Sequence, residues 1–222
     1  MLKFYDISKK MQTLSAELTW SHYCELLSID NVNEINYYIK ITGEHNLSVR
    51  ELRERIKSKE YQRLDDNTKL KLINKEETKV SDFVKNPIVI HNKHNLDKES
   101  ISEKVLQNLI LDDLDNFLLE LGDGFTYIRS EYKIKIGSNY NYIDLLLFNI
   151  KYNCYVVIEL KVTELKKEHI GQIEVYMNYI DKHIKTINQD KTIGIIISKR
   201  DNHYYIEYSS DKRILTREYI LN

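Results

Sequence analysis

The amino-acid sequence predicts a mixed α/β fold, in which a small N-terminal helical module precedes a larger domain built on a mixed sheet. Two observations predict it. Apolar residues recur at helical spacing early in the chain, whereas long apolar runs that suit buried strands lie in the second half. Between them periodicity fades, and the stretch 81–98 holds the single proline. We therefore expect a helical module at 1–80, a linker at 81–98 and the α/β domain at 99–222.

Composition and charge exclude several broad classes of protein. A chain of 222 residues can bury a proper core, and its net charge of −1 gives no overall basic field. No apolar run approaches the about 18–20 residues that span a bilayer, and the N-terminus lacks an apolar signal segment. The two cysteines, Cys24 and Cys154, fit free thiols better than a disulfide. We expect a soluble, cytoplasmic protein without a membrane partner.

Three helices are expected in the N-terminal module. Thr19 can cap the first, and the second fits 33–42 and would stop at Gly43. Ser48 and Glu51 form a capping box that begins the third helix. Three helices within such a short stretch indicate a small, winged-helix-like module.

A possible nucleic-acid contact lies on the third helix of this module. Arg50, Arg53 and Lys57 share one helical face, which could lie along phosphates as in helix-turn-helix proteins. Glu51, Glu54 and Glu60 lie on other faces of the same helix. The alternative is therefore an ordinary solvated face of mixed charge, which the sequence alone favours.

The larger domain is expected to run helix, three strands, helix, strand, strand. Ser100 and Glu103 form a second capping box at the start of its first helix, and the glycines Gly122 and Gly124 end that helix. The other expected elements are strands at 125–136, 143–149, 154–160, 193–197 and 203–208 and a helix at 167–182.

Two of these strands each carry one carboxylate within an apolar run, Asp144 in the first and Glu159 in the second. If the turn is centred between Lys151 and Tyr152, the two acids lie opposite each other, with Cβ atoms about 4.5–5.5 Å apart. Lys161 follows Glu159 by two positions, so it returns to the same face of the sheet.

Like charges placed opposite each other are destabilising unless something lies between them. A divalent cation such as Mg²⁺ is the natural candidate, because hard cations take oxygen ligands. The alternative is an edge strand whose Glu–Lys pair faces the solvent, because Asp-x(14)-Glu-x-Lys alone is a weak pattern.

The order of elements, with Asp on the second strand and Glu-x-Lys on the third, resembles the PD-(D/E)xK nuclease superfamily. More narrowly, six runs from about Leu18 onward resemble the YhcG-like family, in which an N-terminal domain of unknown function precedes the nuclease domain. The runs are LTWSHYCELL, LSVRELRERI, FLLELGDGF, YIDLLLF, VVIELK and GQIEVYMNYID. The resemblance implies a restriction-endonuclease-like αβββαβ core.

Two departures from the family pattern stand out. Ile143 replaces the proline that names the superfamily motif. Family members usually carry a longer helical N-terminus, so the module at 1–80 is expected to be truncated. The shorter module puts independent DNA recognition in doubt.

The resemblance implies roles for the central residues. Asp144 and Glu159 would bind the metal, joined by the main-chain carbonyl of Leu160. Lys161 would orient or deprotonate the attacking water, or stabilise charge on the phosphate.

Three more residues match positions that the superfamily places near its site. Gln172 and Tyr176 lie on the next helix, and Glu103 matches the acidic residue near the start of the first core helix. The capping box offers Glu103 a purely structural alternative of equal weight.

The function expected from these residues is a Mg²⁺- or Mn²⁺-dependent endonuclease acting on DNA, in defence or repair. Its partner would be DNA, and a homodimer with two sites would cut both strands most simply. The alternative is a non-cleaving nucleic-acid-binding or assembly module that keeps the fold.

Overall fold

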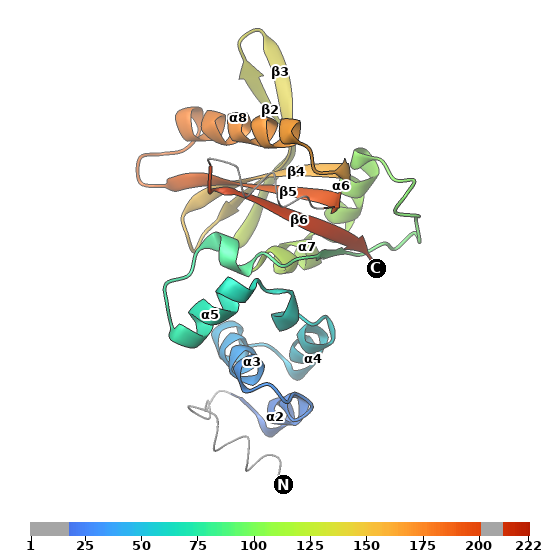
Figure 1. Cartoon of the computed structure of the whole chain (residues 1–222), viewed down its shortest axis with the longest axis vertical. Coiled ribbons are helices and arrows are strands. Elements are labelled where there is room, and N and C mark those ends of the chain that lie inside the picture. Colours follow the sequence, from blue (N-terminus) through green and yellow to red (C-terminus); the bar gives the residue numbers. More distant parts are fainter. Residues whose placement is uncertain (1–17, 201–210) are drawn as a thin grey trace. The chain divides into compact units, whose positions relative to one another are not determined.

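The computed structural model describes residues 18–200 and 211–222. The chain divides into two compact units, Met1–Thr78 and Lys79–Asn222 (Figure 1). Each unit has a hydrophobic core built from its own residues.

The first unit is helical throughout its described residues, 18–78, where no strand forms. Its elements are α2 (Trp20–Leu26), α3 (Val32–His45), α4 (Val49–Lys57), the 3-10 turn η1 (Tyr61–Arg63) and α5 (Asp66–Asn74). Buried side chains from α2, α3, α4 and η1 form its core, namely Leu26, Ile35, Tyr38, Leu52 and Tyr61. A winged helix needs a β-hairpin as its wing, so the winged-helix-like expectation is wrong for these residues.

Local capping explains where these helices begin and end. The Ser48–Glu51 capping box is confirmed, because the Ser48 N–H donates to Glu51 Oε2 at 2.7 Å and the Glu51 N–H to Ser48 Oγ at 3.3 Å. Helix α3 does not stop at Gly43 but continues to His45. Asn46 ends it by taking the left-handed conformation, with φ 50°.

The second unit is organised around one six-stranded mixed sheet, in the order β1-β6-β5-β4-β3-β2. Its strands are β1 (Ile88–Ile90), β2 (Phe125–Ile136), β3 (Asn139–Asn149), β4 (Cys154–Glu164), β5 (Asp190–Arg200) and β6 (Ile214–Leu221). Strands β2, β3 and β4 pair antiparallel, and β4, β5, β6 and β1 pair parallel. The mixed α/β fold class is confirmed.

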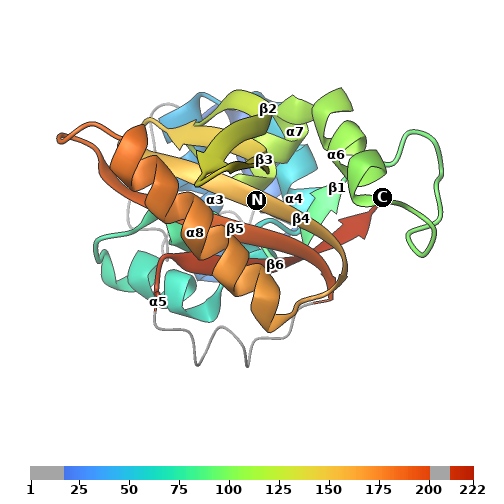
Figure 2. The same ribbon diagram turned by 90° about the horizontal axis from the view of Figure 1, so that it is seen from above.

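Helices cover both faces of this sheet (Figure 2). Helices α6 (Glu103–Asp112) and α7 (Leu114–Leu121) pack in one core cluster, and α8 (Lys167–His183) packs in another. Along β4, Val156 and Ile158 join the first cluster while Val157 joins the second. The apolar run of β4 is therefore buried on both faces, as its sequence predicts.

Several elements differ from the sequence-based expectation. The helix expected from Glu103 is two helices, because Asp113 leaves the helical region, with φ −141° and ψ 50°. The segment 81–98, expected to be a linker, contains most of a 3-10 turn, η2 (Val80–Phe83), and the strand β1, which pairs with β6. Neither α5 nor β6 was predicted, and the strand expected at 203–208 lies outside the described residues.

None of the described helices is both long and apolar enough to cross a membrane. Cys24 is exposed and Cys154 is buried, and neither takes part in a disulfide.

Candidate functional site

The β3–β4 hairpin has the register that its sequence predicts. Leu145 pairs with Ile158, and Asn149 pairs with Cys154 at the end nearest the turn. The backbone ladder between the strands ends at the Leu145–Ile158 pair, one position before the two acids would face each other.

Beyond that point a side chain ties β3 to β4. The Leu160 N–H donates to Asp144 Oδ2 at 2.8 Å. On the other side, the Gln107 side chain of α6 donates from Nε2 to the Asp144 carbonyl at 2.8 Å. Asp144 is therefore held from both β4 and α6, which fixes the position of its carboxylate.

Glu159 is the most deeply buried acid of the site, with 2% of its surface exposed. Its Oε2 lies 3.4 Å from Lys161 Nζ, whereas its Oε1 has no hydrogen-bond partner among the described residues. Burial, followed by the nearby Asp144 carboxylate, raises the pKa of Glu159 to about 8. Burial also raises the pKa of Asp144, against the opposing effects of the Leu160 N–H and Lys161.

Lys161 lies among these acids. Its Nζ is 3.4 Å from Glu159 Oε2 and 3.6 Å from Glu103 Oε2. Burial alone would lower the pKa of Lys161, but the carboxylates of Glu159, Glu103 and Asp144 together raise it. The ammonium group is therefore the form held at neutral pH.

Glu103 reaches the site because it does not cap its helix. The predicted capping box of Ser100 with Glu103 is wrong, because Ser102 is the N-cap and accepts from the Val105 N–H at 3.2 Å. Glu103 is the first residue of α6, and its carboxylate pairs with Lys161. The capping box is therefore excluded as the role of this acid.

Gln172 and Tyr176 are one turn apart on α8, and Gln172 Nε2 donates to the Tyr176 hydroxyl at 3.0 Å. Burial raises the pKa of Tyr176, the Gln172 hydrogen bond lowers it, and the Glu159 and Asp144 carboxylates raise it further. The charges of both acids therefore affect the ionisation of the Tyr176 hydroxyl.

Sequence reasoning missed two polar residues of this region. Gln107 is one turn beyond Glu103 on α6, a spacing that could have pointed to it. His169, half-buried, begins the same helix face as Gln172, and burial followed by Lys161 lowers its pKa.

The donor set fits a hard divalent cation. A buried carboxylate oxygen without a partner is costly, and an oxygen-ligating cation would satisfy it. Within the described residues no group of three or more His, Cys, Asp or Glu side chains is placed to hold a metal ion. Asp144 and Glu159 would therefore need further oxygen ligands, such as a main-chain carbonyl, water or a substrate phosphate.

The basic face expected on α4 is occupied by ion pairs. Arg53 binds Glu25 through two hydrogen bonds of 2.7 and 3.1 Å, and Arg50 pairs with Glu54 at 3.1 Å. Lys57 is the last residue of α4. These contacts favour the alternative of a solvated face with mixed charges.

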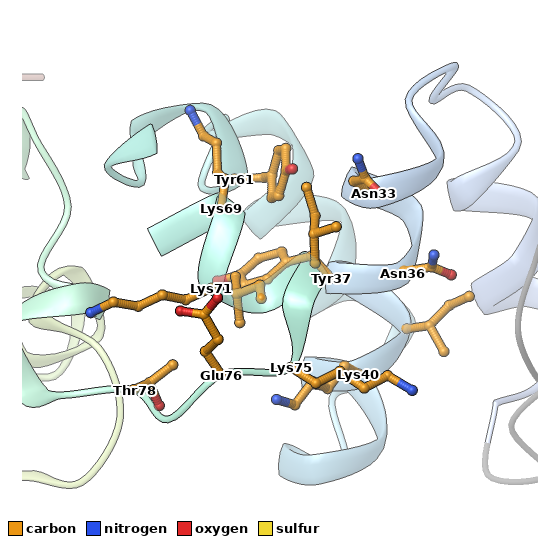
Figure 3. A pocket seen from close by; sticks show the side chains of 13 residues that line it. Asn33, Asn36, Tyr37, Lys40, Tyr61, Lys69, Lys71, Lys75, Glu76 and Thr78 are labelled. Carbon is orange, nitrogen blue, oxygen red and sulfur yellow. The ribbon is translucent and has the colours of Figure 1, made fainter. Parts of the chain in front are cut away.

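A hollow of about 570 Å³ opens in the first unit, lined by residues of α3, η1 and α5 (Figure 3). Lysines line it together with Tyr37, but Lys69 pairs with Asp66 at 2.9 Å and Lys40 with Glu44 at 3.7 Å. It brings together no paired carboxylates, so Asp144 and Glu159 remain the candidate site.

Comparison with known families gives two matches. The family described as the YhcG PDDEXK nuclease domain matches residues 81–221. The family described as the DUF1016 N-terminal domain matches residues 1–63.

Individual relatives were also compared. The curated YhcG protein of Escherichia coli (strain K12) is 29% identical over 202 residues, covering 87% of this chain and 53% of that protein. The chain thus spans about half the length of this relative.

Two solved structures resemble the chain at 19% identity. A repair endonuclease from Pyrococcus abyssi has a TM-score of 0.40 over 54% of this chain and 47% of its own. A complex of EndoMS with double-stranded DNA has a TM-score of 0.41 over 57% and 46%.

Proposed function

The chain belongs to the family of the YhcG PDDEXK nuclease domain, and from this premise we propose that it is a divalent-metal-dependent endonuclease that hydrolyses phosphodiester bonds of DNA. One observation carries the proposal most directly. Glu159 Oε1 is buried without a partner beside the Asp144 carboxylate, an arrangement that is unfavourable until a cation joins it.

The proposed ligands of Mg²⁺ or Mn²⁺ are Asp144 and Glu159, with the Leu160 carbonyl and, near the rim, Glu103. A bound cation would supply charge neutralisation on the phosphate and an acidified water. The hydrogen bond from the Leu160 N–H holds the Asp144 carboxylate in place, which supports this role.

Lys161 stabilises negative charge on the phosphoryl oxygens. Its raised pKa keeps it protonated, which argues against a role as the general base. A fixed positive charge in a partly desolvated site is worth more than the same charge in water. Gln172 and Tyr176 offer an amide and a hydroxyl from α8, which would orient the substrate phosphate or the attacking water.

The setting of this activity is part of the proposal. Free cysteines fit a reducing cytoplasm, and a homodimer would present two sites to the two strands of a duplex. Defence against foreign DNA or repair of branched DNA is the proposed context.

Cleavage of linear, supercoiled and branched DNA with Mg²⁺, Mn²⁺ or EDTA tests the proposal. Lys161→Ala is expected to lower the cleavage rate by about 100-fold or more, as loss of a charge-stabilising group does. Lys182→Ala removes an exposed lysine from the end of α8 and is the matched control. Equal cleavage by the wild type, Asp144→Ala and Lys161→Ala would show that the activity comes from elsewhere.

Calorimetric titration with Mg²⁺ separates this proposal from a non-cleaving nucleic-acid-binding module. The nuclease is expected to bind the cation, with the binding lost in Glu159→Gln. Salt-sensitive DNA binding without any divalent-ion binding would favour the module.

A further inference from the structure

Strands β2 and β3 continue beyond the point where β3 leaves β4, and form a two-stranded arm, residues 132–143. Figure 1 shows this β2–β3 arm projecting past α8. Five pairs join its strands, from Tyr132 with Ile143 to Ile136 with Asn139. Gly137, with φ 61°, begins the turn at its tip.

The inner face of the arm is anchored. Ile134 and Ile143 are 1% and 0% exposed and belong to the core cluster that α8 completes. An isolated two-stranded hairpin is marginally stable in water, so this packing gives the arm a fixed direction.

The outer face carries cations and aromatic rings. Lys133 lies opposite Tyr142 in the pairing, and Lys135 lies opposite Tyr140. Both tyrosines are about half exposed, at 52% and 55%, and both lysines are exposed. Lys133 Nζ lies 3.8 Å from the centre of the Tyr140 ring.

The arm leads directly to the candidate site. Tyr142 is two residues from Asp144 along β3, and Asp144 is where the β3–β4 ladder has ended. The base of the arm and the candidate site therefore adjoin on strand β3.

We propose that the β2–β3 arm inserts into the major groove of double-stranded DNA and positions the adjacent phosphodiester backbone at Asp144 and Glu159. This proposal rests on the proposed nuclease function, and it specifies double-stranded DNA as the substrate. Five paired residues at about 3.4 Å each give the arm a length of roughly 17 Å. The major groove of B-DNA is about 12 Å wide and 8.5 Å deep, and it admits a two-stranded β-ribbon.

The charge of the arm, the shape of the RNA groove and the covered Tyr140 ring together favour duplex DNA over RNA and over a single strand. Lys133 and Lys135 supply the positive charge that phosphates on the groove walls require. An RNA duplex has a deep, narrow major groove that proteins cannot enter, which excludes the same docking. Lys133 lies over the Tyr140 ring and occupies the place where an unpaired base would stack, which disfavours a single strand.

Binding of a fluorescent DNA duplex to the full chain tests the proposal, with EDTA present so that the DNA stays intact. The double variant Lys133→Ala/Lys135→Ala is expected to weaken binding roughly tenfold or more. Its slope of log affinity against log salt should be shallower by about 1.8, because each phosphate contact contributes about 0.9. The matched control is Lys182→Ala/Lys191→Ala, which removes two exposed lysines from α8 and β5.

The control variant is expected to keep wild-type affinity and slope, and a shared melting temperature verifies that both variants are folded. Competition with a single strand and with an RNA duplex of the same sequence is expected to be weak. Wild-type affinity and slope in the arm variant, an equal loss in the control, or equal competition by RNA would overturn the proposal.

Failure of this inference is distinguishable from failure of the nuclease proposal. If the wild type cleaves DNA and the arm variant binds and cleaves as well as the wild type, the arm proposal falls and the nuclease stands. If no metal supports cleavage but the arm variant loses duplex binding, the binding of the arm to duplex DNA stands, whereas the nuclease proposal and the positioning of DNA for cleavage fall.

Discussion

Glu159 is a buried acid whose protonation is coupled to folding. Its pKa is about 8 in the folded chain and 4.5 ordinarily, so the folded chain keeps a proton that the unfolded chain releases. Stability should therefore fall as the pH rises from about 4.5 to about 8. Each pKa unit corresponds to about 1.4 kcal/mol, so the loss is on the order of several kcal/mol.

Glu159→Gln removes this ionisation and keeps the shape of the side chain. In EDTA at pH 9 we expect its melting temperature to exceed that of the wild type by roughly 5 °C or more. The difference should vanish well below pH 4.5, where the wild-type acid is protonated in both states. Calorimetric or circular dichroism melts across this pH range measure the effect, and parallel curves for the two proteins would contradict it.

At the scale of single residues, much of the candidate site could be predicted from the sequence. Asp144, Glu159 and Lys161 were placed together by strand periodicity and turn position alone. The role of Glu103 could not be settled that way, because Ser100 and Ser102 compete to cap one helix and only the folded chain decides between them. Gln107 belongs to no motif, and only its spacing of one turn from Glu103 links it to the site in the sequence.

Helix α8 and strand β5 approach closely at Gly194, where no side chain separates them. A Cβ added there would lie 2.5 Å from Met177 Sδ and 2.9 Å from Ile173 Cδ1, and both side chains are fully buried. Gly194→Ala is expected to cost about 1–3 kcal/mol of stability through overpacking. It should also lower cleavage, because α8 carries Gln172, one of the residues proposed for the site.

Gly171 provides the control on the same helix. A Cβ added at Gly171 meets nothing within 4 Å, so Gly171→Ala should stabilise α8 by about 0.5–1 kcal/mol. Urea denaturation with a cleavage assay measures both variants. A Gly194→Ala protein as stable and active as Gly171→Ala would refute the close approach of α8 and β5.

Elements differ in how well local sequence predicts them. Strand β4 and the second half of β3 are largely apolar on both faces and can be predicted from the sequence. Strand β1, in contrast, has only three residues, and β6 mixes apolar residues with Thr216, Arg217 and Glu218. Both missed strands are defined by parallel pairing with distant residues, which local periodicity does not encode.

At the scale of the whole molecule, the chain is two units with separate cores. All buried members of the two core clusters in the larger unit come from its own residues, between Val80 and Tyr219. A fragment of residues 79–222 is therefore expected to fold without the first unit.

Far-ultraviolet circular dichroism of that fragment should show a cooperative melt. In the full chain, the fluorescence of Trp20, the single tryptophan, reports on the helical unit, while circular dichroism reports on both units. A fragment that lacks a cooperative transition, or that precipitates while the full chain stays folded, would show that the larger unit depends on the smaller one.

The hydrogen bond from the Leu160 N–H to Asp144 Oδ2 has an evolutionary consequence. A descendant that lost cleavage would still need a side-chain acceptor at this position to tie β3 to β4, and asparagine would serve. Retention of a side-chain oxygen at position 144 is therefore by itself a weak sign that a relative is active. Glu159 Oε1 makes no such structural contact among the described residues. In a lineage that has lost nuclease activity, we therefore expect substitutions at position 159 to appear before substitutions at position 144.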